Sequence, residues 1–198
     1  MSVTLPSSPG FASYRPFLVD FGGVQKSALG GASQRVNRLG NRFGLEVQLP
    51  PMAAGATAMG WIAALNQGLQ DGVICNWPQT GFTVGAPGGL LVNGAAQGGT
   101  TLNVDGGNSA YAYFAGQMFN ITVGGRYALY QIRSQGALNG AGAAALPILP
   151  EIRRSPADNS ALLITQPVIE GFLEGDGREW TVDLARTVGL AFTVIEAS

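Results

Sequence analysis

Apolar and polar residues alternate along residues 43–49, so that one face of a predicted strand is apolar and the other carries Glu46 and Gln48. The segment 186–197, near the other end of the chain, repeats the same order of an arginine, a glycine, alternating apolar residues and an acidic residue. We therefore predict that the two segments are partner strands of one sheet. Both ends of the chain would then build a common framework.

The helical period appears over residues 52–70, directly after Pro50 and Pro51. The spacing predicts a helix with one buried stripe and with Trp61 packed beside it, rather than serving as a ligand platform. Gly68 and Asp71-Gly72 are typical of a helix end. The predicted stripe consists of Ala58, Ile62, Leu65 and Leu69.

Short strand patterns occupy most of the remaining chain. We predict framework strands at 16–24, with a possible bulge at Gly22-Gly23, and at 73–76, 81–84, 168–173, 180–184 and 189–196. Residues 174–178 contain an Asp-Gly turn signal. Residues 1–15 have the composition of an extended arm that is ordered only by contact with something else, or of a disordered tail.

A cluster of glycine and proline at 85–89 marks a predicted domain junction. Five short strands follow, at 90–93, 100–104, 117–123, 126–133 and 143–149, with Gly124-Gly125 as a two-residue hairpin turn. Such spacing is typical of a small, closed or nearly closed β-barrel. The predicted fold is mainly β: a β-sandwich framework with one α-helix, from residues 1–85 with 170–198, and an inserted small barrel-like β-domain, residues 86–169.

The composition adds to this picture an expectation that the protein associates with other proteins. Only 12% of the 198 residues are charged, about half the usual share, and a surface so poor in charge favours association with other proteins. Glycine, with 30 residues, is about twice as frequent as usual and fits many tight turns. One lysine and a net charge of −1 argue against general binding of nucleic acid.

The chain is poor in catalytic chemistry. It has no histidine, and Cys75 is its only cysteine, which excludes histidine-based nucleophile activation, histidine-ligated zinc and an intrachain disulfide. Residues 140–145 match a loose dinucleotide-binding pattern, but prolines follow where a helix is required. Acidic residues near 105–108 and 174–179 lack the spacing of a calcium loop. We predict no catalytic residue, cofactor or metal, and therefore a protein that is not an enzyme.

No secretory signal or membrane insertion is expected, because no charge precedes Arg15 and the apolar runs are short or broken by proline. Three arginines, Arg35, Arg38 and Arg42, lie within eight residues before the strand at 43–49. They either bind carboxylates of a neighbouring subunit or belong to a solvated loop. We name them as candidate subunit-interface residues.

Several segments resemble the distal tail proteins and related tail-tip hub components of long-tailed bacteriophages and gene transfer agents. The framework match is RLGNRF at 38–43, which leads to LPP at 49–51 and a helix with Trp61, together with GLAFTV at 189–194. The insert match comprises GQMFNI at 116–121, GRY at 125–127, PILP at 147–150 and RSPAD at 154–158. These patterns cover about three quarters of the chain and contain no catalytic signature.

The resemblance implies a structural virion protein that assembles in the host cytoplasm and forms a ring, commonly hexameric, at the distal end of the tail. Its partners would be further copies of itself, the tail tube protein and the tail-tip hub proteins. We see no carbohydrate-binding module, so the resemblance does not extend to direct receptor binding. The alternatives are another ring-forming virion subunit, such as a tail terminator, tube-like or head-tail connector protein, or a β-rich hydrolase or glycan-binding domain of the tail tip.

Overall fold

A computed structural model describes residues 1–175, 180–182 and 187–197. Strands account for 47% of the structure and helix for 8%. This confirms the predicted mainly β fold with a single helix and a barrel-like part.

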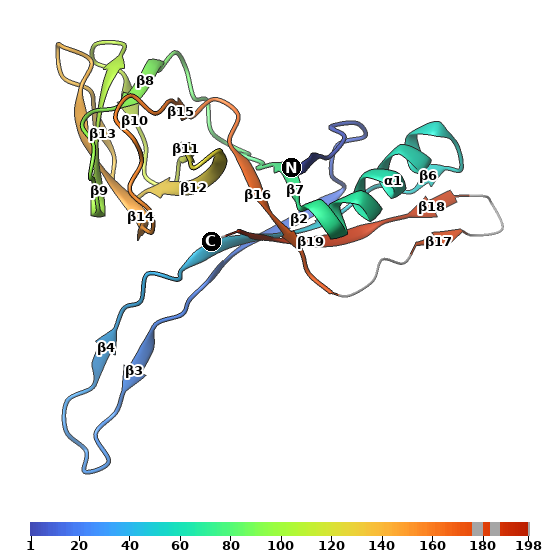
Figure 1. Ribbon diagram of the computed structural model, residues 1–198, viewed down its shortest axis with the longest axis horizontal. Helices are drawn as coiled ribbons and strands as arrows, with labels where there is room; N and C mark the ends of the chain where they lie inside the picture. The colour runs from blue at the N-terminus through green and yellow to red at the C-terminus, as the bar shows by residue number, and fades with distance from the viewer. Residues whose placement is uncertain (176–179, 183–186, 198) are drawn as a thin grey trace.

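The framework is a six-stranded sheet in the order β1-β7-β16-β19-β5-β2. The predicted pairing of the two chain ends is confirmed, since β19 runs antiparallel to β5 with Phe192 opposite Val47 and Val194 opposite Leu45. Strands from both ends therefore lie side by side (Figure 1). The bounds are β1 Val3–Thr4, β2 Ser13–Val19, β5 Arg42–Gln48, β7 Val73–Asn76, β16 Val168–Leu173 and β19 Ala191–Glu196.

Helix α1 (Ala56–Asp71) covers one face of this sheet, where the Trp61 ring contacts Phe192 at a centroid distance of 6.0 Å. Trp61 is fully buried and donates from Nε1 to the Ser8 carbonyl oxygen at 3.0 Å, so it has a packing role. The stripe is as predicted except at Leu69, which is exposed while Gly68 is buried in its place.

The start of the helix was placed too early. Met52–Ala53 forms strand β6 and pairs with β18 (Thr187–Gly189), which in turn pairs with β17 (Thr181–Val182). Residues that far away in sequence give no local signal at position 52, so the helical period was extended over a strand. Residues 81–84, predicted as a strand, form none.

A second six-stranded sheet forms from residues 88–163, in the order β15-β11-β12-β14-β9-β8, and is nearly closed. Gly124 and Gly125 join β11 to β12 with φ values of +58° and +78°, so the predicted two-residue hairpin turn is confirmed. A short pair, β10 (Ala112–Tyr113) with β13 (Gly136–Ala137), lies beside this sheet. The bounds are β8 Gly88–Val92, β9 Gly99–Gly107, β11 Met118–Val123, β12 Arg126–Ile132, β14 Ala144–Ile152 and β15 Leu162–Leu163.

Buried polar groups join the two sheets. The Glu196 carboxylate accepts hydrogen bonds from the backbone N–H of Leu129, at 2.8 Å, and of Phe43, at 3.2 Å, and forms a buried ion pair with Arg153. Asn120 exchanges two hydrogen bonds with the backbone of Val168, at 2.7 and 2.6 Å. These bonds satisfy polar groups that would otherwise be costly to bury.

A long hairpin projects from the framework, away from both sheets (Figure 1). It contains β3 (Gly23–Gln25) and β4 (Gln34–Val36) and extends the pair β2–β5 beyond Val19 and Arg42. We call residues 20–41 the arm; none of them is buried. The single strand expected at 16–24 is thus interrupted at residues 20–22 and pairs in two separate sheets.

The N-terminal segment is ordered by the chain itself. Val3–Thr4 pairs in parallel with β7, Leu5 enters the core, and the Ser2 hydroxyl donates to the buried Glu170 at 2.6 Å. These contacts lie within the chain. They correct both expectations for residues 1–15, namely an arm that is ordered only by contact with something else and a disordered tail. The predicted turn at 174–178 and the end of the strand predicted at 180–184 lie partly outside the described residues.

Candidate functional site

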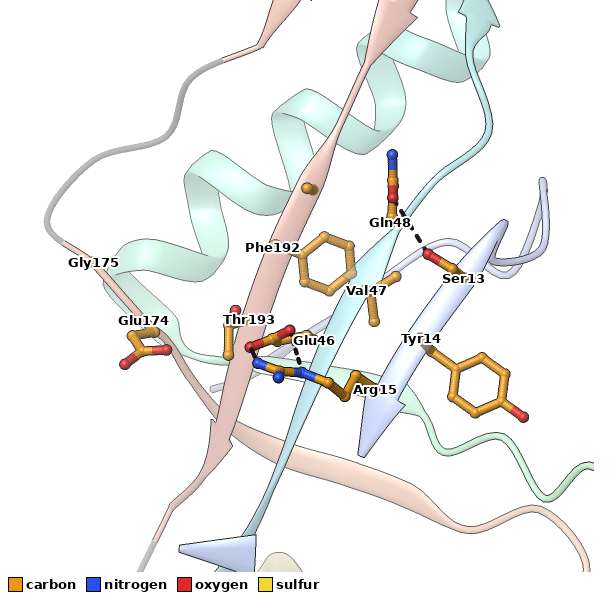
Figure 2. A pocket seen from close by; sticks show the side chains of 11 residues that line it. Ser13, Tyr14, Arg15, Glu46, Val47, Gln48, Glu174, Gly175, Phe192 and Thr193 are labelled. Atoms are coloured by element: carbon orange, nitrogen blue, oxygen red, sulfur yellow. Dashed lines mark hydrogen bonds and ion pairs between the residues drawn. The ribbon is translucent and has the colours of Figure 1, made fainter. Parts of the chain in front are cut away.

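The face of the framework sheet opposite α1 is open and contains a hollow of about 640 Å³ between β2, β5 and β19 (Figure 2). The strand register places its side chains in cross-strand rows, because directly paired residues point to the same face. One row consists of Ser13, Gln48 and Ala191, and the next of Arg15, Glu46 and Thr193. We call this surface the open face.

An exposed ion pair lies in the middle of the hollow (Figure 2). Arg15 binds both carboxylate oxygens of Glu46, with a distance of 2.8 Å from Nε to Oε2. This hydrogen bonding lowers the pKa of Glu46 and raises the pKa of Arg15. Ser13 donates from its hydroxyl to Gln48 at 3.3 Å. Both pairs are solvated, so they favour recognition more than stability.

An apolar row crosses four strands of the open face beside the ion pair. Phe17 pairs with Gly44, Gly44 with Ile195, and Ile195 with Phe172. The Phe17 ring occupies the space above Gly44, where an added Cβ would lie 2.2 Å from the ring. Phe172 is 52% exposed. The framework sheet therefore has apolar side chains on its solvent face as well as in its core.

Two arginines flank this apolar row. The Arg42 guanidinium lies 4.8 Å from the centre of the Phe21 ring, and that of Arg126 lies 5.9 Å from the centre of the Phe172 ring. Arg42 Nε is buried and has no hydrogen-bond partner. A cation held over an aromatic ring is partly desolvated, which strengthens its attraction to a carboxylate.

The three arginines named from the sequence are divided between two places. Arg35 and Arg38 line a second hollow of about 270 Å³, between the base of the arm and β14, and Arg35 forms an ion pair with Asp20. Arg42 is the first residue of β5 and lies on the open face, in register with Val19. Their role in a subunit interface remains a prediction.

A third hollow, of about 400 Å³, lies between β2 and the inserted sheet and has no charged residue in its lining. Tyr14, Trp77 and Phe82 contribute aromatic rings, while Gln79 and Gln131 contribute amides. Gln79 accepts a hydrogen bond from the Met118 N–H at 2.8 Å. This groove suits an uncharged ligand.

The sequence alone does not identify Phe17, Phe172 and Arg126 as residues of these surfaces. A signal existed for the first, because β2 contains apolar residues at consecutive positions, as strands covered on both faces do. Phe172 and Arg126 needed the tertiary structure, since it alone brings β12 next to β16.

Within the described ranges, no group of three or more histidine, cysteine, aspartate or glutamate residues is placed to hold a metal ion. The polar side chains of the open face bind one another in pairs, Arg15 with Glu46 and Ser13 with Gln48. An arrangement of this kind can recognise a protein surface.

A scan against protein-family models and a search of curated proteins return no match for this chain. In the part of the chain that the structure describes, no helix combines the length and the apolar character that crossing a bilayer requires.

Proposed function

We propose that this protein is a structural component of a bacteriophage tail that forms a ring at the distal end of the tail and joins the tail tube to the tail tip or baseplate. The observation that carries the proposal is the arm. Residues 20–41 extend into solvent with no buried residue of their own. An isolated two-stranded hairpin is marginally stable in water, so such an arm is typical of a subunit that contacts its neighbours.

The side chains of the arm support this reading. Leu29 is 97% exposed, and Val24, Leu39 and Phe21 are also exposed. Lys26, Arg35 and Arg38 give the arm three cations against the single carboxylate of Asp20, within a chain of net charge −1. Apolar contact together with attraction to acidic surfaces of the next subunit would order the arm.

The resemblance to distal tail proteins gives the ring its place in the particle and its partners, namely further copies, the tail tube protein and the tail-tip hub proteins. Arg35, Arg38 and Arg42 are the residues we propose for the interface between subunits. Other ring-forming virion subunits share the same physics of assembly. The position of the density in the particle would distinguish them.

The test replaces residues 23–36 with Asn-Gly, which closes a short hairpin without the arm. We expect the wild-type chain to form a closed ring in light scattering and electron microscopy, and the shortened chain to remain a folded monomer. Val24→Thr is the control, because it changes a residue of the hairpin but keeps the arm. A wild-type chain that stays monomeric at micromolar concentration, with no ring in virions, would refute the proposal.

The uncharged aromatic groove favours a second candidate, the binding of a glycan at the tail tip. Aromatic rings and amides are the groups that pack against sugar rings and bond their hydroxyls. Binding on a glycan array that is lost in Phe82→Ala, with wild-type thermal stability, would support it. An empty array would leave the groove as a contact between the two sheets.

A further inference from the structure

We infer that the open face of the framework sheet binds the same face of a second copy across a twofold axis, so that two sheets form one sandwich. This interface is separate from the ring of the proposed function. It uses the sheet surface and not the arm, and Arg42 is the residue that both proposals share.

The apolar row supplies the contact. Phe17, Ile195 and Phe172 lie across neighbouring strands, and Phe172 stays 52% exposed with the Arg126 guanidinium 5.9 Å from the centre of its ring. The other face of the same sheet is covered by α1 and by Met118 and Leu129 of the inserted sheet. Packing two sheets face to face is the usual way to bury a second apolar face.

The charges identify the second copy as the occupant. Arg42, Gly44 and Glu46 follow one another on the same face of β5, with the cation on one side of the apolar row and the carboxylate on the other. A twofold axis along the row reverses the strand. Arg42 of each copy then lies over Glu46 of the other, and Gly44 lies over Gly44. A partner with carboxylates alone would suit Arg42 but would oppose Glu46.

Two local features agree with this arrangement. The Arg42 guanidinium lies 4.8 Å from the centre of the Phe21 ring, and its terminal N–H groups are the donors for a carboxylate of the second copy. Glu46 already binds Arg15 and has lone pairs for a second guanidinium. A carboxylate between two arginines is a charge arrangement that is stabilised in a partly buried interface.

The geometry gives a direct test by cross-linking. A residue on the axis faces its own counterpart across a gap of about 10 Å, the spacing of stacked sheets. Phe172 lies in the axial row, so Phe172→Cys should join two copies through a bismaleimide of similar span. Gln48 is exposed on the same face but four residues from the row, about 14 Å along the strand, so it lies about 29 Å from its counterpart across the gap. Gln48→Cys is therefore the matched control.

We expect Phe172→Cys to form covalent dimers at least about tenfold faster than Gln48→Cys, because the second thiol is held nearby. Native Cys75 is buried and stays silent in both. Equal rates in the two variants, or no dimer from Phe172→Cys, would overturn the inference. The ring could persist in that case, so the failure would be distinguishable from failure of the proposed tail function.

A second test exchanges the charges at Arg42 and Glu46. It is needed because the Phe172→Cys substitution could itself weaken the contact between the two copies. Arg42→Glu places two carboxylates opposite two carboxylates, and Glu46→Arg places arginine opposite arginine, so neither variant should dimerise alone. Mixed together, each variant supplies the charge that the other lacks. Formation of the mixed dimer, measured by sedimentation with one copy labelled, supports the interface. Absence of a mixed dimer, with both variants folded, contradicts it.

Discussion

The β11–β12 hairpin and the β3–β4 hairpin of the arm each have a glycine pair between their two strands, and they differ in almost everything else. The β11–β12 hairpin keeps six residue pairs in register around Gly124-Gly125, and most of β11 is buried. The β3–β4 hairpin of the arm keeps three pairs, with Gly30-Gly31 at its end, and buries nothing. Similar local chemistry thus gives a structural element in one place and a projecting contact arm in the other, because only the first has a core to join.

The largest expected difference comes from removing one phenylalanine ring in each hairpin. Phe119→Ala in β11 empties a fully buried position beside Tyr130 and should lower the free energy of unfolding by about 3–5 kcal/mol. Phe21→Ala in the arm removes an exposed ring and should change it by less than about 0.5 kcal/mol. Urea unfolding of both variants measures the two values. Equal losses would mean that the arm folds together with the core.

The ion pairs of the two regions give the second comparison. Arg153→Ala leaves the buried Glu196 carboxylate without its cation and should cost about 3 kcal/mol, the lower end for a broken buried pair. The lower end applies because Glu196 keeps the N–H groups of Phe43 and Leu129. Arg35→Ala breaks the exposed pair with Asp20 and should leave the unfolding curve unchanged.

Double-mutant cycles can separate this pair from the rest of the junction. Arg153→Met with Glu196→Gln replaces both charges and should be less destabilising than Arg153→Ala alone, since no charge is left buried. A double variant that is as unstable as the sum of its singles would show that the two side chains act independently.

The third comparison uses two glycines, one in each hairpin, with nearly the same backbone φ angle. Gly125 has φ +78° and Gly30 has φ +75°, and an added Cβ would meet nothing within 4 Å at either position. Gly125→Ala should cost about 1–2 kcal/mol, because alanine resists the left-handed region. Gly30→Ala meets the same local resistance, but the arm opens without global unfolding, so the global free energy should not change. Urea unfolding checks the first, and faster amide exchange confined to the arm checks the second.

The contrast also explains what the sequence could predict. Strand β11, its partner β12 and the turn between them were placed within one residue, because burial imposes alternation and the turn requires glycine. For the arm the sequence predicts one strand and a loop, because exposed strands need no apolar alternation and Gly22-Gly23 resembles a bulge. The helical period extends over Met52–Ala53, because the strand partners of these residues begin only at Thr187.

The candidate site is harder to predict from the sequence than the arm. Three arginines close in sequence were expected to act together, yet Arg35 and Arg38 line one hollow and Arg42 lies on another face. The row of Phe17, Ile195 and Phe172 depends on the register of four strands that are distant in sequence. Spacing along a chain cannot supply such a register, whereas the match of residues 43–49 with residues 186–197 could indicate the pairing of two strands.

The smallest expected effect is the response of Asp20 and the arm to low pH. The N–H of Gly22, at 2.9 Å, and then Arg35 hold the pKa of Asp20 below its ordinary value of 3.8. A carboxyl whose pKa is lower in the folded arm contributes order above its unfolded pKa and loses that contribution as the pH falls through the folded pKa. Carbon-detected NMR titration should therefore find the midpoint of Asp20 below 3.8. Arg35→Ala should raise the midpoint without restoring the ordinary value, because Gly22 still donates its hydrogen bond. The protection factors of the arm amides, taken relative to intrinsic exchange at the same pH, should fall while β11–β12 stays protected, and simultaneous loss of protection in both hairpins would contradict the independence of the arm.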